Sequence, residues 1–163
     1  MKKKVAIVVL ICLLFLSAGI IAVVLFVKNI DFKKEAIKAR EFASIMDDEN
    51  YEIIDVTAQY ESYGIDEAYV AIEENRDYQI EFYELSSESK AKNMFETNKD
   101  YFEDGAGSSK ITSSYSIGNY NLYSLTSNGN YQYLCRVDNT LLYIDVEDEY
   151  KDEVKDIIEE LGY

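Results

Sequence analysis

Three pairs of turn-forming residues divide the second half of the chain into short segments, and this pattern constrains the fold most. The pairs are Gly118-Asn119, Asn128-Gly129 and Asp138-Asn139. Gly, Asn and Asp tolerate the positive φ angles of two-residue hairpin turns, and Asn-Gly is the strongest such signal. The pattern therefore predicts an antiparallel meander of four strands, at 110–117, 120–127, 130–137 and 140–146.

Further strand and helix patterns surround this meander. Alternating apolar residues predict strands at 67–73 and 78–85. The segment 51–63 fits a strand and a helix equally well and stays open. Helical spacing of apolar residues occurs in three segments, 31–46 (with Asp31 as the expected N-cap), 86–104 and 149–161. The order predicts one α+β domain in which helices pack on a curved antiparallel sheet.

The two-residue turns also fix which side chains share a face of the predicted meander. One face is mostly apolar and is the expected core: Tyr115, Leu122, Tyr131, Tyr133, Cys135, Val137, Leu142, Ile144 and Val146. Cys135 lies in the middle of this set. We therefore expect its thiol to be buried and unreactive.

The opposite face of the meander carries more apolar side chains than a solvated face needs. Tyr123, Leu134 and Tyr143 lie directly across from one another on three strands. Three explanations stay open: cross-strand stabilisation, a covering helix, or an exposed patch that binds a partner. Aromatic, aliphatic and arginine side chains are typical of interface centres. The candidate interaction face is Tyr123, Leu134, Arg136, Leu141 and Tyr143.

An uncharged apolar run extends over residues 5–27, between Lys4 and Lys28. As a helix it measures about 34 Å at ~1.5 Å per residue, enough to cross a hydrocarbon core roughly 30 Å thick. A cleaved signal peptide is the main alternative. Apolar residues continue beyond the small residues at 17–19, however, and this continuation favours a retained anchor.

A lipid-modified Cys12 is a second alternative, but Leu10 and Ile11 stand where small residues are expected. We therefore predict an N-terminal transmembrane anchor over residues 1–28 and a separate domain over residues 29–163. The membrane is the expected contact of residues 5–27.

The orientation in the membrane depends on the basic residues at the two ends of the run. Three lysines precede it and five basic residues follow within 28–40, so the count is ambiguous. The first three are compact, as in a signal sequence, whereas most of the later ones are interleaved with glutamates. We expect a single-pass protein of the cell membrane with its domain outside the cytoplasm.

The expected domain is strongly acidic. It holds all 31 acidic residues and 12 of the 16 basic ones, an excess of 19 negative charges. Such a field repels nucleic acids and anionic lipid headgroups, so neither is an expected partner of the domain. A protein or cell-envelope partner stays open.

The composition excludes several kinds of catalytic and metal site. The chain has no His, which excludes Ser-His and Cys-His nucleophiles. A single cysteine in the domain excludes the usual zinc sites, and there is no glycine-rich phosphate loop. We therefore expect no cofactor. Asp145, Glu147, Asp148 and Glu149 are weak calcium candidates, because acidic residues at the start of a helix also suit its dipole.

These observations favour a membrane-tethered, non-catalytic binding or interaction module of unknown ligand. A carboxylate-based cell-envelope enzyme is an alternative, because carboxylate pairs are plentiful. A purely structural assembly protein is another, because the small residues Ala18, Gly19 and Ala22 in the apolar run suit helix association.

Overall fold

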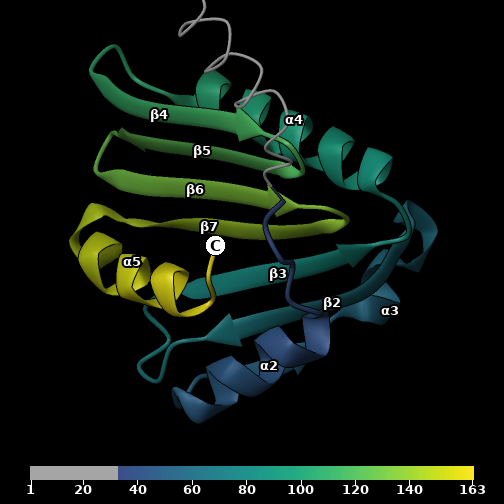
Figure 1. Ribbon diagram of the computed structural model, residues 1–163. Helices are drawn as coiled ribbons and strands as arrows, with labels where there is room; N and C mark the ends of the chain where they lie inside the picture. Colours follow the sequence, from purple (N-terminus) through teal and green to yellow (C-terminus); the bar gives the residue numbers. More distant parts are fainter. Residues whose placement is uncertain (1–32) are drawn as a thin grey trace, which may run out of the picture. The chain divides into compact units, whose positions relative to one another are not determined.

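A seven-stranded antiparallel sheet organises residues 33–163, the part of the chain that this computed structural model describes (Figure 1). The strands are β1 (Glu52–Asp55), β2 (Ile65–Ile72), β3 (Gln79–Leu85), β4 (Lys110–Ile117), β5 (Tyr120–Ser127), β6 (Asn130–Val137) and β7 (Thr140–Glu147). The helices are α2 (Ala39–Asp48), α3 (Thr57–Tyr60), α4 (Glu88–Gly105) and α5 (Lys151–Glu160), with 3-10 turns η1 (Glu61–Tyr63) and η2 (Asp148–Tyr150). The predicted α+β class is confirmed.

The four-stranded meander forms as predicted because its turns adopt the expected backbone conformations. Asn128 and Gly129 have φ angles of 54° and 84°, as a type I′ turn requires. Gly118 and Asp138 have φ angles of 55° and 49° at the first turn position alone, as in type II′ turns. The register of all three hairpins is the predicted one.

The last strand of the meander joins the β2–β3 hairpin into one sheet. β7 pairs with β3, so that Ile80 lies opposite Ile144 and Phe82 opposite Leu142. The strand order is β1-β2-β3-β7-β6-β5-β4. β1 and β4 are therefore the two edges, and α4 leads from the end of β3 to the distant edge at β4 (Figure 1).

Helices cover both faces of this sheet and create two hydrophobic cores. On one face, Phe42 of α2 and Val154 and Ile158 of α5 belong to the core that contains the predicted core face. On the other face, Phe95 and Phe102 of α4 belong to a second core. The sequence pattern predicted the first core and left the second open, as one of three explanations for the apolar residues on that face.

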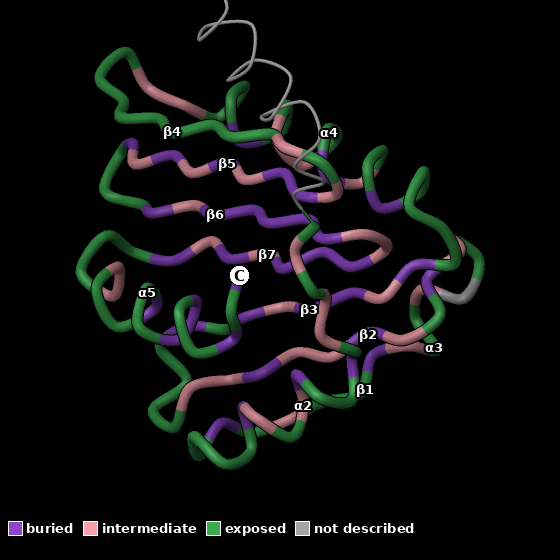
Figure 2. The backbone as a smooth tube through the Cα atoms, viewed as in Figure 1, coloured by how far each residue is buried: buried purple, intermediate pink, exposed green. Residues whose placement is uncertain are grey.

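The predicted core face is largely confirmed. The buried members are Tyr131, Tyr133, Cys135, Val137, Leu142, Ile144 and Val146. Leu122 is partly buried, whereas Tyr115 is 52% exposed. Tyr115 differs because it lies on the edge strand β4, the least buried strand of the meander (Figure 2).

The ambiguous segment 51–63 contains both predicted structures. It forms β1, then α3 and η1, and it ends at Gly64, whose φ of 76° is left-handed. A side chain other than glycine is strained in that conformation. The segment therefore contains a short strand and short helices, and neither pattern holds over its whole length.

The first helix begins later than predicted. The expected span was 31–46, but the helix starts at Ala39; Asp31 lies outside the described residues. Tertiary hydrogen bonds explain the difference. The Asn119 side chain bonds both the N–H and the carbonyl of Lys34, at 2.9 and 2.7 Å, and Glu84 accepts the N–H of Ala39 at 3.3 Å.

Within residues 33–163, no helix has the length and apolar character needed to cross a bilayer. The predicted anchor at 5–27 lies outside the described residues.

We expect Leu134→Ala to lower the free energy of unfolding by about 2–5 kcal/mol, because Leu134 has no exposed area and the shorter side chain leaves a cavity. Ile54→Ala is the matched control, since Ile54 is 38% exposed and its loss should cost about 1 kcal/mol or less. Urea unfolding followed by circular dichroism measures both. Equal losses would contradict the buried position of Leu134.

Candidate functional site

The candidate interaction face lies beneath helix α4. Tyr123, Leu134 and Leu141 are at most 2% exposed and share a core with the apolar side of α4. Tyr143 is half-buried, with its ring centroid 5.3 Å from that of Phe102. Of the three open explanations, the covering helix is therefore the one that the structure shows. The prediction of an exposed patch is corrected, because burial against α4 accounts for these apolar side chains.

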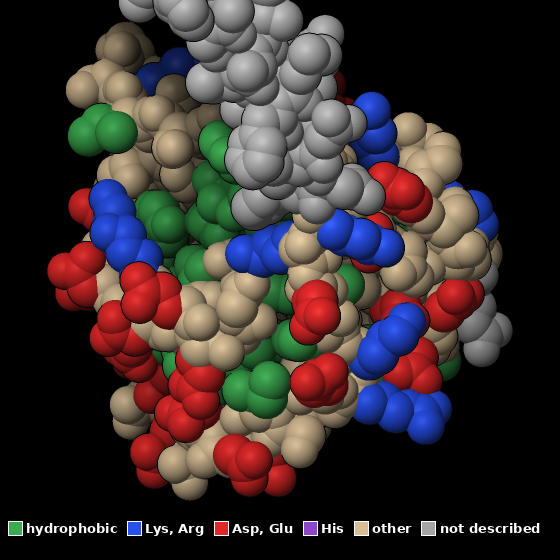
Figure 3. Space-filling view, in the orientation of Figure 1, with side chains coloured by type: hydrophobic (Ala, Val, Ile, Leu, Met, Phe, Trp, Pro, Cys, Tyr) green, Lys and Arg blue, Asp and Glu red, His purple; other side chains and the backbone are tan. Residues whose placement is uncertain are grey.

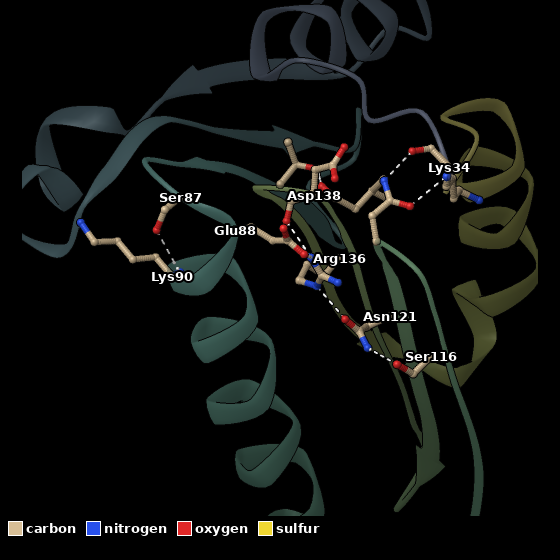
Figure 4. A network of polar contacts seen from close by, with 11 residues as sticks. Lys34, Ser87, Glu88, Lys90, Ser116, Asn121, Arg136 and Asp138 are labelled. Carbon is tan, nitrogen blue, oxygen red and sulfur yellow. Dashed lines mark hydrogen bonds and ion pairs between the residues drawn. The ribbon is translucent and has the colours of Figure 1, made fainter. Parts of the chain in front are cut away.

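Arg136 belongs to a buried polar network (Figure 4). Its Nε donates to Asn121 Oδ1 at 2.6 Å, and its Nη1 donates to the Asp138 carbonyl at 2.8 Å and to Glu88 Oε1 at 3.2 Å. The Arg136 side chain is 3% exposed, whereas that of Glu88 is 61% exposed. Because Glu88 lies in the first turn of α4, this network ties the start of the helix to β5 and β6.

Cys135 is fully buried in the core on the opposite side of the sheet, as predicted. Burial raises the pKa of its thiol to about 12. The reactive form of cysteine is the thiolate, which is scarce at neutral pH when the pKa is this high. Cys135 therefore has no feature of a nucleophile.

The weak calcium candidates do not form a shared cage. Asp145 accepts hydrogen bonds from two amide side chains of β6, at 2.9 and 3.4 Å. Lys151 lies 3.5 Å from Asp148, and Glu147 and Glu149 are exposed to solvent. Over the described residues, no group of three or more acidic or cysteine side chains is placed to hold a metal ion.

A pocket of about 580 Å³ opens between α4 and the segment formed by α3 and η1. It is lined by Gln59, Tyr60, Tyr63, Ile65, Leu85, Lys90, Asn93, Met94, Thr97 and Asn98. The left-handed turn at Gly64 places Tyr63 just before β2, where its side chain is 72% exposed. Tyr60 packs edge-on against Tyr63 and Tyr83, at centroid distances of 6.4 and 5.6 Å.

Among the side chains that the structure describes, the lining of this pocket contains no carboxylate, although the chain has 31 acidic residues. Three other hollows of the same domain each have two or more Asp or Glu side chains in their walls. The polar groups of the pocket are the amides of Gln59, Asn93 and Asn98, the hydroxyl of Thr97 and the ammonium of Lys90. Its electrostatic character therefore differs from that of the surrounding surface.

Local contacts position the polar groups of the pocket. Lys90 Nζ donates to Ser86 Oγ at 2.9 Å, and the Lys90 side chain lies over Gly64. A Cβ at Gly64 would meet Lys90 Nζ at 2.0 Å, but this flexible chain end can move aside, so the left-handed φ angle is what favours glycine there. Asn98 donates from Nδ2 to the Met94 carbonyl at 2.8 Å, which fixes the orientation of its amide.

The sequence reasoning missed this pocket because its walls come from separate segments. Tyr60 and Tyr63 lie in the segment with the ambiguous pattern, and Lys90 to Asn98 lie in the first three turns of α4. The run of tyrosines near Gly64 was the available signal, but nothing local indicates that α4 faces it.

Comparison of the chain with protein-family models, with curated proteins and with solved structures finds no significant match. The fold and the site therefore define the class directly. It is an acidic α+β domain with helices on both faces of a seven-stranded antiparallel sheet and a pocket beside α4 that contains Tyr60, Tyr63 and Lys90.

We expect Asn121→Ala to lower the free energy of unfolding by about 1–3 kcal/mol, because it removes the acceptor for the buried Arg136 Nε. Glu88→Gln alters the exposed partner of the same arginine and should cost about 1 kcal/mol or less. Urea titration of both variants tests this order. A larger loss for Glu88→Gln would show that the ion pair, rather than the buried amide, holds Arg136.

Proposed function

We propose that this protein is a membrane-tethered, non-catalytic binding module whose ligand occupies the pocket between α4 and η1. In this proposal residues 1–28 are the anchor, residues 5–27 cross the cell membrane, and the domain over residues 29–163 lies outside the cytoplasm. The uncharged length of the run supports the anchor, and the compact lysines before it support the orientation.

The observation that carries the binding proposal is the absence of carboxylates among the pocket-lining side chains that the structure describes. The domain as a whole repels anions and attracts cations. The described lining offers amides, a hydroxyl, the Lys90 ammonium and tyrosine rings, a set that suits an uncharged ligand rich in hydrogen-bond acceptors instead. Amides donate and accept hydrogen bonds, and tyrosine rings offer flat apolar faces.

The ligand class that matches these groups outside the cytoplasm is a neutral, N-acetylated cell-envelope saccharide. Its hydroxyl and acetamido groups match Gln59, Asn93 and Asn98, and the apolar face of a sugar ring matches Tyr60 and Tyr63. The volume of about 580 Å³ lies in the usual range for small-ligand pockets.

The two alternative functions have weaker support. An enzyme based on carboxylates needs an acid and a base that converge on one bond. The described lining of the pocket beside α4 offers neither. In the hollow that contains Asp77, Asp145 and Glu147, the Asp145 carboxylate already accepts two amide hydrogen bonds. A structural assembly role rests on residues 5–27, which lie outside the described residues.

We expect the full-length protein in detergent micelles to bind chitotetraose, a neutral N-acetylated saccharide, and Tyr63→Ala to weaken this binding at least tenfold. That loss corresponds to about 1.4 kcal/mol and reflects the removal of an aromatic face. Isothermal titration calorimetry gives both affinities. Tyr101→Ala is the matched control, because Tyr101 is a 68% exposed tyrosine on α4 outside this pocket.

The possible outcomes test the ligand class and the location of the binding site separately. No binding by the wild-type protein at millimolar saccharide would overturn the ligand class. Binding that both tyrosine variants weaken equally, or that neither weakens, would overturn the pocket as the site.

A labelling experiment tests the orientation. In a Cys12→Ala background, we expect Tyr101→Cys to react with a membrane-impermeant maleimide on intact cells, because this position is exposed on the domain. The buried Cys135 should stay unlabelled in the parent protein. Labelling that requires permeabilised cells would place the domain in the cytoplasm.

A further inference from the structure

Strand β4 forms an open edge of the sheet. Seven of its eight residues are exposed and Ile117 is intermediate. In the part of the chain that the structure describes, β4 pairs with β5 alone, so one side of its backbone has no partner strand. Ile111 and Tyr115 on this strand are 75% and 52% exposed. A long edge strand with exposed apolar side chains is a template for pairing with another strand.

The opposite edge of the same sheet is protected against such pairing. β1 has four residues, and its ends are the acidic Glu52 and Asp55. Glu52 also forms an ion pair with Arg76. Short length and charged side chains are the usual means by which proteins block an edge. β4 has eight residues, no proline and Lys110 as its single charge, so this protection is missing there.

The charge distribution favours contact between two copies at this edge. No Asp or Glu occurs in residues 105–137, which include β4, β5 and β6. On the face in Figure 3, acidic side chains gather over α2 and α5 instead. Two copies that meet at β4 therefore place no carboxylate of either strand against the other, whereas contacts through the acidic surface repel.

The β4–β5 turn determines which backbone groups of β4 point outward. Ile117 and Tyr120 flank this two-residue turn and face each other across it. Residues in these two positions form backbone hydrogen bonds with each other. Hydrogen bonding to the neighbouring strand alternates along an antiparallel pair. The N–H and carbonyl groups of Thr112, Ser114 and Ser116 therefore point away from β5, toward the free edge.

We propose that two copies of this chain pair through β4 in antiparallel orientation, about a two-fold axis at Ser113. In this register the outward backbone N–H and carbonyl groups of Thr112 in one copy form hydrogen bonds with those of Ser114 in the other. Ile111 of each copy then lies opposite Tyr115 of its partner. Each such pair of a β-branched and an aromatic side chain adds roughly 0.2–1 kcal/mol. This self-complementarity makes a second copy, rather than an unrelated strand, the occupant that fits the edge.

Disulfide cross-linking of the full-length protein in its native membrane tests this register. In a Cys12→Ala background, Ser113→Cys brings two thiols to one pair position, where Cα atoms lie about 4.5 Å apart, within disulfide range. Ser116→Cys is the matched control, because Ser116 lies on the same strand and is also exposed. In this register the two copies of residue 116 lie about 20 Å apart, at ~3.4 Å per residue. After mild oxidation we expect at least tenfold more covalent dimer from Ser113→Cys than from Ser116→Cys.

A second variant separates strand pairing from random collision. Ile111→Lys in the Ser113→Cys background replaces the apolar side chain opposite the partner's Tyr115 with lysine, a residue that blocks edge pairing, and should reduce the dimer yield several-fold. Ile111 is exposed, so the fold should be retained, and circular dichroism checks this. Equal dimer from Ser113→Cys and Ser116→Cys, no dimer from a folded Ser113→Cys, or an unchanged yield with Ile111→Lys would overturn the proposal. None of these outcomes depends on the ligand of the pocket.

Discussion

Pairing between β3 and β7 is the contact on which the rest of the domain depends. The β2–β3 hairpin and the β4–β7 meander each have their own turns, and this pairing makes them one sheet. It places the most apolar strands in the middle, where Ile80, Leu141 and Ile144 have no exposed area. Because the central strands are apolar on both faces, each face needs a helical layer. The positions of α2, α4 and α5, the pocket beside α4 and the exposed edge at β4 all follow from this arrangement.

Features with local causes could be predicted from the sequence. The turns at 118–119, 128–129 and 138–139 contain residues that accept positive φ, so the meander and its register followed directly. The alternation of apolar residues then identified the buried set around Cys135 and Ile144. The start of α2 could not be predicted in this way. Asn119, more than 80 residues away in sequence, bonds both backbone groups of Lys34, which lies outside the helix.

The sequence pattern also could not show what covers the second apolar face of the sheet. Tyr123 and Leu134 show the same alternation whether a helix of the chain or another protein covers them, because burial does not depend on which molecule supplies the apolar surface. The position of α4 decides between the two. Arg136 is a second example. The residue types around it suggested an interface, but its hydrogen bonds to Asn121 and to the Asp138 carbonyl give it a structural role.

The pocket and the open edge lie on different parts of the sheet, and this separation matters for how the two proposals combine. The pocket is lined by residues of 59–65, 85 and 90–98, and β4 contributes none of them. Pairing through β4 therefore uses none of the pocket-lining residues of either copy. A polymeric saccharide presents many identical units, so a dimer could engage it at two points. The second contact would then be intramolecular, and overall binding could exceed that of one pocket without any new contact. Weak binding by a single pocket is thus compatible with firm attachment of the dimer to a polymer.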